Sequence, residues 1–189
     1  MARYIGSCFV PLTVLHFVFN MIVGNNHRCY EKKTGRGTYK YHKFASESVL
    51  LMEANLPRSL NEYCDYFKIN FFDLRLRCIF CLFYTSLTDL ADFHTKKLSI
   101  VYRNNSPFVC CIKCARHSAR IDREKYTLCS VNCAILDAVV GKPLKEIIIR
   151  CCTCFALLDD AEKADACARE QAVLLIRGNW RTECRNCKS

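Results

Sequence analysis

The chain has 189 residues, enough for one ordinary domain or two small ones, and 16 of them are cysteine. This cysteine content is typical of disulfide scaffolds and metalloproteins, and the repeated C-x-x-C pairs disfavour a short secreted disulfide scaffold. The net charge of +10 suits an acidic partner, either nucleic acid or acidic peptide, and does not distinguish the two.

Residues 1–51 differ in character from the rest of the chain. They carry seven basic and two acidic side chains, which is half of the net charge. Their apolar run at 8–23 has 16 residues, is short for a membrane span, and is not followed by a small-x-small cleavage site. The basic stretch EKKTGRGTYKYHK has no hydrophobic period. We therefore expect an extension that is disordered or not translated natively, translation from Met52, and no membrane partner; a working signal or anchor is the alternative.

From Met52 onward, the sequence predicts alternating helices and strands. Ser59, Ser86 and Asp159 are typical helix-capping residues. Helical spacing and capping predict helices over residues 58–67, 86–95, 113–128, 133–140 and 159–171. Apolar and β-branched runs predict strands over residues 97–103, 145–151 and 172–178. The helix over 113–128 is polar and charged, which suits a connector between two domains that is exposed on one side.

The cysteines repeat with a constant offset of 73 residues. Both sets read C-x2-C-x29-C-x2-C, and 36 residues separate the sets. The repeat extends beyond the cysteines, because FFDLRLRC at 71–78 aligns with LKEIIIRC at 144–151. This pattern indicates an internal duplication. We expect an α+β fold of two duplicated small zinc-binding modules, each with a short antiparallel sheet and helices. The modules are expected over residues 52–114 and 129–189, joined by a connector helix over 115–128.

Two pairs of thiolates, each held by a short turn, can close tetrahedrally on Zn2+. The identical spacers of the two sets favour zinc over redox or disulfide use. Four thiolates per ion leave no open coordination position, so both sites should be structural and should contribute folding free energy. The expected ligands of two structural Zn2+ ions are Cys78, Cys81, Cys111, Cys114, Cys151, Cys154, Cys184 and Cys187.

The other eight cysteines are expected to be buried small apolar residues. Cys110 and Cys152 each lie next to an expected ligand. Cys129 and Cys133 are four apart on an expected helix, and a third metal site there lacks two further partners nearby.

The sequence gives little support for catalysis, and we expect that the protein is not an enzyme. The five histidines are scattered, and no Gly-rich phosphate loop, nucleophile elbow or paired-carboxylate motif is found. The histidine-bearing spacing of a RING-type ubiquitin ligase is also absent.

Three strings accompany the duplicated cysteine pattern: IVYRNNSPFVCCIKC at 100–114, KPLKEIIIRCCTC at 142–154 and IRGNWRTECRNC at 176–187. With that pattern they make residues 52–189 resemble the papillomavirus early protein six family (the E-six oncoprotein). Early protein seven of the same viruses has only one such module. The family also starts where Met52 lies, which agrees with an extension over residues 1–51.

The resemblance implies a viral early regulatory oncoprotein that is a non-enzymatic adaptor. Such a protein binds acidic L-x-x-L-L helices of host proteins in an apolar pocket between its modules and connector helix. It thereby redirects ubiquitin ligase or transcription coactivator activity and blocks apoptosis, differentiation and antiviral responses. The positions that match the family's pocket are Ile79, Phe80, Leu98, Val101, Tyr102, Ala115, Ser118, Ile121, Arg150 and Trp180. Basic side chains that could pair with acidic residues of the helix are Arg103, Arg120, Arg150, Arg177 and Arg181.

Each of these positions has a plainer interpretation. Ile79, Leu98 and Val101 can be core residues, and surface arginines usually only interact with solvent. Arg150 is the strongest single candidate for recognising acidic residues of the partner, because it lies at the end of an apolar strand immediately before an expected zinc ligand.

The implied partners are a HECT-type ubiquitin ligase or Mastermind-like coactivators. The chain ends in CRNCKS without a PDZ-binding motif, so no PDZ partner is expected. Asn179 lies where some relatives have an arginine. This difference puts in doubt the ligase-directed degradation of a tumour suppressor that some family members carry out. The resemblance further implies localisation to the host nucleus and cytoplasm and weak self-association. The alternative function is a zinc-dependent DNA-binding modulator of transcription, although no finger helix with base-reading spacing is found.

Overall fold

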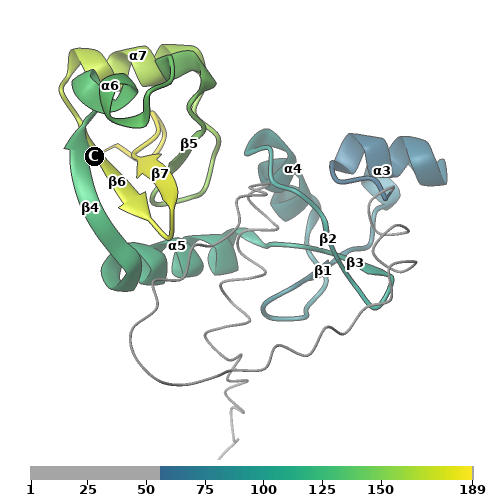
Figure 1. Cartoon of the computed structure of the whole chain (residues 1–189). Helices are drawn as coiled ribbons and strands as arrows, with labels where there is room; N and C mark the ends of the chain where they lie inside the picture. Colours follow the sequence, from purple (N-terminus) through teal and green to yellow (C-terminus); the bar gives the residue numbers. More distant parts are fainter. Residues whose placement is uncertain (1–55, 189) are drawn as a thin grey trace, which may run out of the picture.

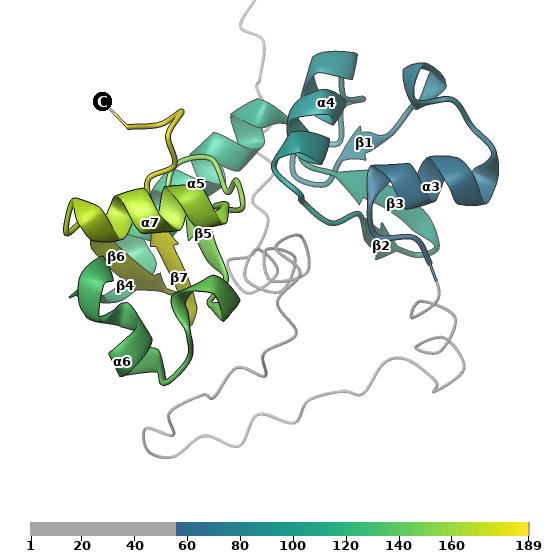
Figure 2. The ribbon, with the colours of Figure 1, turned by 90° about the horizontal axis from the view of Figure 1, so that it is seen from above.

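A computed structural model describes residues 56–188 as two small modules with the helix α5 (Ile112–Tyr126) running between them (Figures 1 and 2). The extension predicted over residues 1–51 lies outside the described residues. The α5 helix buries one face, formed by Ala115, Ser118, Ala119 and Asp122, and exposes its charged face. This agrees with the one-sided connector predicted over 113–128.

The first module consists of short elements around a three-stranded sheet. In chain order these are α3 (Leu60–Phe67), η1 (Phe71–Asp73), β1 (Arg77–Cys78), α4 (Leu87–Thr95), β2 (Val101–Arg103) and β3 (Ser106–Val109). The strand order is β1-β3-β2, where β1 and β3 are parallel and β2 and β3 are antiparallel. The α3 helix starts at Ser59 with a capping box, as the sequence predicts.

The second module repeats this arrangement and adds a strand. Its elements are β4 (Thr127–Asn132), η2 (Cys133–Ile135), α6 (Leu136–Val140), η3 (Leu144–Glu146), β5 (Ile149–Cys151), α7 (Asp160–Ala168), β6 (Ala172–Ile176) and β7 (Asn179–Thr182). The strand order is β4-β6-β7-β5. The parallel pair β5/β7 corresponds to β1/β3, and β4 forms an additional antiparallel edge against β6.

The duplication is visible in details of the backbone. The isolated bridge between Arg77 and Tyr84 recurs between Arg150 and Leu157, at the 73-residue offset of the cysteines. The residue that follows the first C-x-x-C pair of each module has a left-handed backbone conformation, with φ of 62° at Leu82 and 66° at Phe155. The predicted fold of two duplicated modules is therefore confirmed, and the mixed α and β elements are those of an α+β protein.

The prediction of purely antiparallel sheets needs a correction, because each sheet contains one parallel pair. Within each module, a helix and a strand intervene between the two parallel strands, and such a crossover returns the chain in the same direction. The strands β3 and β7 were not expected. Each follows a tight turn with two left-handed residues, Asn104 and Asn105 in the first module and Arg177 and Gly178 in the second. Such turns suit two-residue hairpins.

A second correction concerns the start of the second module. Cys129 lies in β4, and Cys133 begins η2, so these residues do not share the helix expected for them. Cys129 is also exposed, so the prediction that it is buried is wrong. The chain leaves α5 after Tyr126 directly into β4, which pairs with β6 over Thr127–Asn132. Pairing with a distant strand overrides the helical spacing of the local sequence here.

Each module has its own apolar core, and one residue crosses between them. Phe155 belongs to the second module by sequence, yet it is buried in the core of the first module with Leu98, Val101 and Ala115. The corresponding residue of the first module, Leu82, is 54% exposed, whereas Phe155 is 2% exposed. The two copies of the turn thus have different roles, and the second one joins the modules.

Candidate metal centres and the junction between the modules

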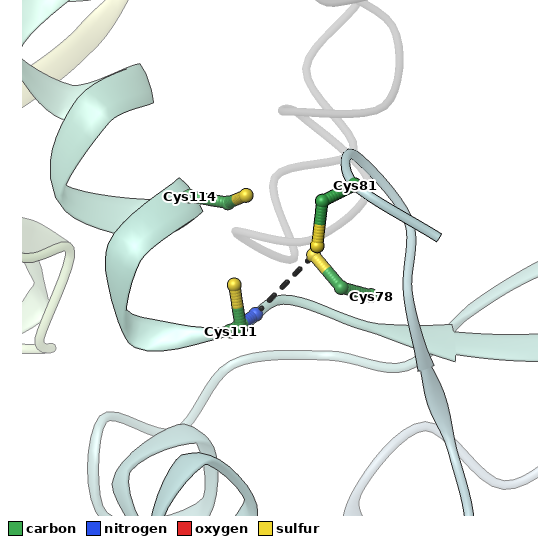
Figure 3. Close-up of side chains that lie close together, drawn as sticks. All are labelled: Cys78, Cys81, Cys111 and Cys114. Carbon is green, nitrogen blue, oxygen red and sulfur yellow. Dashed lines mark hydrogen bonds between the residues drawn. The ribbon is translucent and has the colours of Figure 1, made fainter. Parts of the chain in front are cut away.

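The first cluster combines a turn after β1 with the start of α5. Cys78 ends β1 and Cys81 lies on the turn that follows, while Cys111 is the N-cap residue of α5 and Cys114 lies in its first turn. The four sulfur atoms point toward one another (Figure 3) and all lie within 4.8 Å of each other. The backbone N–H of Cys111 donates to Cys78 Sγ at 3.5 Å.

The second cluster has the same construction at the 73-residue offset. Cys151 ends β5 and Cys154 lies on the turn that follows, and Cys184 and Cys187 come after β7. Their sulfur atoms also lie within 4.8 Å of one another, and Cys154 Sγ is 3.8 Å from Cys184 Sγ. The backbone N–H of Cys184 donates to Cys151 Sγ at 3.4 Å, which repeats the bond from Cys111 to Cys78.

The donor sets fit zinc. Zinc–sulfur bonds of about 2.3 Å in a tetrahedron place the sulfurs about 3.8 Å apart. Both clusters offer four sulfurs within 4.8 Å of one another, and the Cys154–Cys184 separation is 3.8 Å, so each could hold a metal ion with no position open for substrate. The eight expected ligands are thereby brought together in the two predicted groups.

The environment of each first cysteine favours the thiolate that a metal requires. A hydrogen bond from the Cys154 side chain, assisted by the N–H groups of Cys184 and Thr153, lowers the pKa of Cys151 to about 4 against the effect of burial. Hydrogen bonds from the side chains of Cys110 and Cys114 lower the pKa of Cys78 far below its ordinary value. The same hydrogen bonds raise the pKa of Cys114 and of Cys154, so metal binding has to displace protons from these ligands.

A carboxylate behind each cluster positions the second cysteine pair. Asp89, in the first turn of α4, accepts hydrogen bonds from Ser86 and from the backbone N–H of Ile112 at 2.9 Å. Glu162, in the first turn of α7, accepts from Asp159 and from the N–H of Arg185 at 3.0 Å. Ile112 and Arg185 each directly follow the third cysteine of a set. The helix cap therefore also fixes the backbone that carries the metal ligands.

Asp89→Asn and Glu162→Gln should weaken metal binding without removing a ligand. Outer partners of metal ligands typically account for about 10- to 100-fold in affinity, and we expect a loss near the lower end for each variant. Competition with a chromogenic chelator measures the affinity. The matched control is Asp73→Asn, an exposed carboxylate in η1 of the first module, which should leave the affinity unchanged.

The residues expected to line a peptide pocket lie in three settings. Ile79, Leu98, Val101 and Ala115 are buried together with Phe155, while Phe80 and Tyr102 are half-buried against the same cluster. Ser118 is buried and Ile121 half-buried on α5. Trp180 packs against the core of the second module. The first group therefore surrounds the point where the modules meet.

The Arg150 side chain ties the second module to the first. It is buried, and its guanidinium donates to the carbonyl oxygens of Lys96 at 3.1 Å, Lys97 at 2.9 Å and Phe155 at 3.1 Å. Burial lowers the pKa of Arg150 to about 10, which leaves it charged at neutral pH. In this arrangement the arginine interacts with backbone at the junction and not with solvent.

Two further arginines meet a carboxylate that the sequence did not single out. Asp122 on α5 is 2% exposed, and its Oδ1 lies 2.8 Å from Arg177 Nε and its Oδ2 3.5 Å from Arg181 Nη2. Arg177 also stacks on the Tyr126 ring at 3.3 Å from the centroid, and Arg181 lies over the Phe155 ring at 4.8 Å. Asp122 follows Ala115 and Ser118 on one helical face, which is the signal that could have identified it.

The remaining predicted arginines are more accessible. Arg120 is exposed on α5 at 4.0 Å from Glu124, and Arg103 is half-buried at the end of β2. Arg120 also lines an open depression of about 370 Å³ between α5 and the turn after β5. Its other lining residues are Arg116, His117, Arg123, Cys152 and Thr153. This depression therefore concentrates positive charge from α5.

Comparisons with known proteins agree with these observations. The family model of Early Protein (E6) matches residues 78–187. The chain is 46% identical over 138 residues to Protein E6 of Human papillomavirus type 48, covering 73% of this chain and 97% of that protein. It is 48% identical over 131 residues to Protein E6 of Human papillomavirus 65, covering 69% of this chain and 94% of that protein. Within residues 56–188, no helix has the length and apolar character needed to span a membrane.

Proposed function

Since the chain belongs to the E6 family of papillomavirus early proteins, we propose that it is a non-enzymatic adaptor that binds acidic L-x-x-L-L helices of host proteins. The two four-cysteine clusters hold structural Zn2+ in this proposal. The helices belong to a HECT-type ubiquitin ligase or to Mastermind-like coactivators, and the protein acts in the host nucleus and cytoplasm.

The observation that carries the proposal is the apolar cluster at the junction. Ile79, Leu98 and Val101 of the first module belong to one buried cluster with Ala115 of the connector helix and Phe155 of the second module. An amphipathic helix needs apolar walls from several directions, and such junctions between domains are common binding sites. Arg150, which donates to the carbonyl oxygen of Lys97 at the junction, and Arg120 on the exposed face of α5 suit acidic residues beside the leucines.

Phe155 occupies the place that a ligand helix would take. Because this ring is almost fully buried in the first core, a leucine entering here has to displace it. The hydrogen bonds from Arg150 to Lys96 and Lys97 would open in the same movement and free the guanidinium for the ligand. Binding is therefore coupled to separation of the modules, and the free energy of opening reduces the apparent affinity.

The test compares Phe80→Ala with Phe83→Ala in the metal-loaded full chain. Phe80 is half-buried against the junction cluster, whereas Phe83 is 76% exposed on the same turn. Fluorescence anisotropy measures binding of a labelled acidic L-x-x-L-L peptide and of the same peptide with its leucines replaced by alanine. Complete burial of a phenylalanine side chain contributes about 1.5–3 kcal/mol, and Phe80 is already half-buried before the ligand binds, so Phe80→Ala should weaken binding about 3- to 10-fold. Phe83→Ala should bind as the wild type does.

Metal content and circular dichroism of both variants establish that they are folded. Equal binding of the leucine and alanine peptides would contradict the proposal, as would equal affinities of the two variants.

The second candidate function is DNA binding, and the basic depression on α5 favours it. Arg116, Arg120 and Arg123 could contact phosphates there. This function predicts binding to duplex DNA that weakens steeply with salt and falls on Arg116→Ala. Such a result, together with no leucine-dependent peptide binding, would replace the adaptor proposal.

A further inference from the structure

Two cysteines outside both four-cysteine clusters lie side by side in the second module. Cys167 Sγ is 2.9 Å from Cys133 Sγ and 3.1 Å from the Cys133 carbonyl oxygen. Cys133 begins η2, directly after β4, and Cys167 lies in the last turn of α7. The sequence predicts only small buried side chains at both positions, because the residues are 34 apart and have no counterparts in the repeat.

We propose that Cys133 and Cys167 are an oxidative modification site that closes reversibly to a disulfide by exchange with a small-molecule disulfide such as oxidised glutathione. A disulfide bond is about 2.05 Å long, so the two sulfurs have to approach by about 0.9 Å. Both residues lie in short elements that already contact each other, and no separation of the modules is required.

The burial of the two thiols gives them different roles in the exchange. Cys167 is half-buried and accessible, whereas Cys133 is 1% exposed. The Cys167 thiolate attacks one sulfur of oxidised glutathione, forms a mixed disulfide and releases one glutathione thiolate. Cys133 then loses its proton, and its sulfur attacks Cys167 Sγ and expels the second glutathione. Two protein thiols are oxidised and one glutathione disulfide is reduced to two thiols.

Cys129 provides an internal comparison. It is exposed on β4 in the same module, and no sulfur contact to it is found among the described residues. Oxidised glutathione should therefore leave a persistent mixed disulfide on Cys129, whereas the adduct on Cys167 should be resolved by Cys133.

Mass spectrometry after non-reducing tryptic digestion of the metal-loaded full chain tests the proposal. Exposure to oxidised glutathione should link the peptide of residues 164–169 to that of residues 126–145, with fragmentation placing the bond at Cys133. Cys133→Ala should instead trap glutathione on Cys167, and Cys167→Ser should leave Cys133 unmodified. Cys129→Ser should leave the link unchanged. The metal content, measured in parallel, should stay at the level of the untreated protein.

The proposal would be overturned by glutathione on Cys167 to the same extent with and without Cys133. A link that forms only after metal is released would overturn it as well, because the disulfide would then belong to the unfolded module.

Discussion

Cys151→Ser is expected to unfold the second module and to leave the first module folded. Cys151 is a fully buried member of the second cluster, and the turn that carries it also carries Phe155 and follows Arg150. Structural zinc contributes about 10–16 kcal/mol of apparent binding free energy, which is more than a module of this size can replace with its apolar core. Circular dichroism and the dispersion of amide resonances measure the loss.

The matched control is Cys129→Ser, since Cys129 is exposed in the same module and belongs to neither cluster. It should leave both the spectrum and the metal content unchanged. Treating the wild type with a strong chelator and a reductant should unfold both modules. A chelated protein that retained its dispersed resonances would contradict a structural role for the metal.

Asp122→Ala is expected to lower the free energy of unfolding by about 3–5 kcal/mol, because it deprives two buried guanidinium groups of their carboxylate. Arg177 and Arg181 both lie against Asp122, with side chains 5% and 0% exposed. Burial already lowers the pKa of Arg181 to about 10 although Asp122 opposes the shift. Without the carboxylate, the two buried guanidinium charges would be uncompensated and would destabilise the packing of α5 against the second sheet.

Glu124→Ala is the control for that substitution. Glu124 lies on the same helix in an exposed pair with Arg120, and such pairs contribute about 0–1 kcal/mol. Urea unfolding of the metal-loaded proteins at one fixed metal concentration measures both variants. A loss below about 1 kcal/mol for Asp122→Ala would show that the guanidinium groups find other partners.

The repeat in the sequence was enough to predict the two four-cysteine clusters. Ligand spacing is a local property, and the 73-residue offset distinguishes Cys151 and Cys154 as ligands from Cys152 between them. Helix starts at Ser59, Ser86 and Asp159 were also predicted, because capping depends on residues within one turn.

The contacts between the modules could not be predicted from the sequence. Phe155 and Leu82 occupy equivalent positions in the repeat, and only the docking of the second module buries one and exposes the other. Asp122 likewise joins α5 to Arg177, which lies 55 positions later in the chain. The strand β4 was missed for the same reason, since its partner β6 is distant in sequence.

Arg150 shows how these long-range contacts change an interpretation. Its position before an expected metal ligand suggests that its side chain binds acidic residues of a partner helix, and this binding role stays a prediction. Its hydrogen bonds to the carbonyl groups of Lys96 and Lys97 in the first module give it a second role in holding the modules together. Under the proposed adaptor function, binding of the helix would require the exchange of these contacts for contacts with the ligand.

Native mass spectrometry of the full chain tests the central claim most directly, because it counts and identifies the bound metal. The account predicts two zinc ions per wild-type chain, one per chain for a Cys151→Ser variant, and two for Cys129→Ser. A wild-type chain that carries no metal, or a Cys151→Ser variant that still carries two ions, would contradict it.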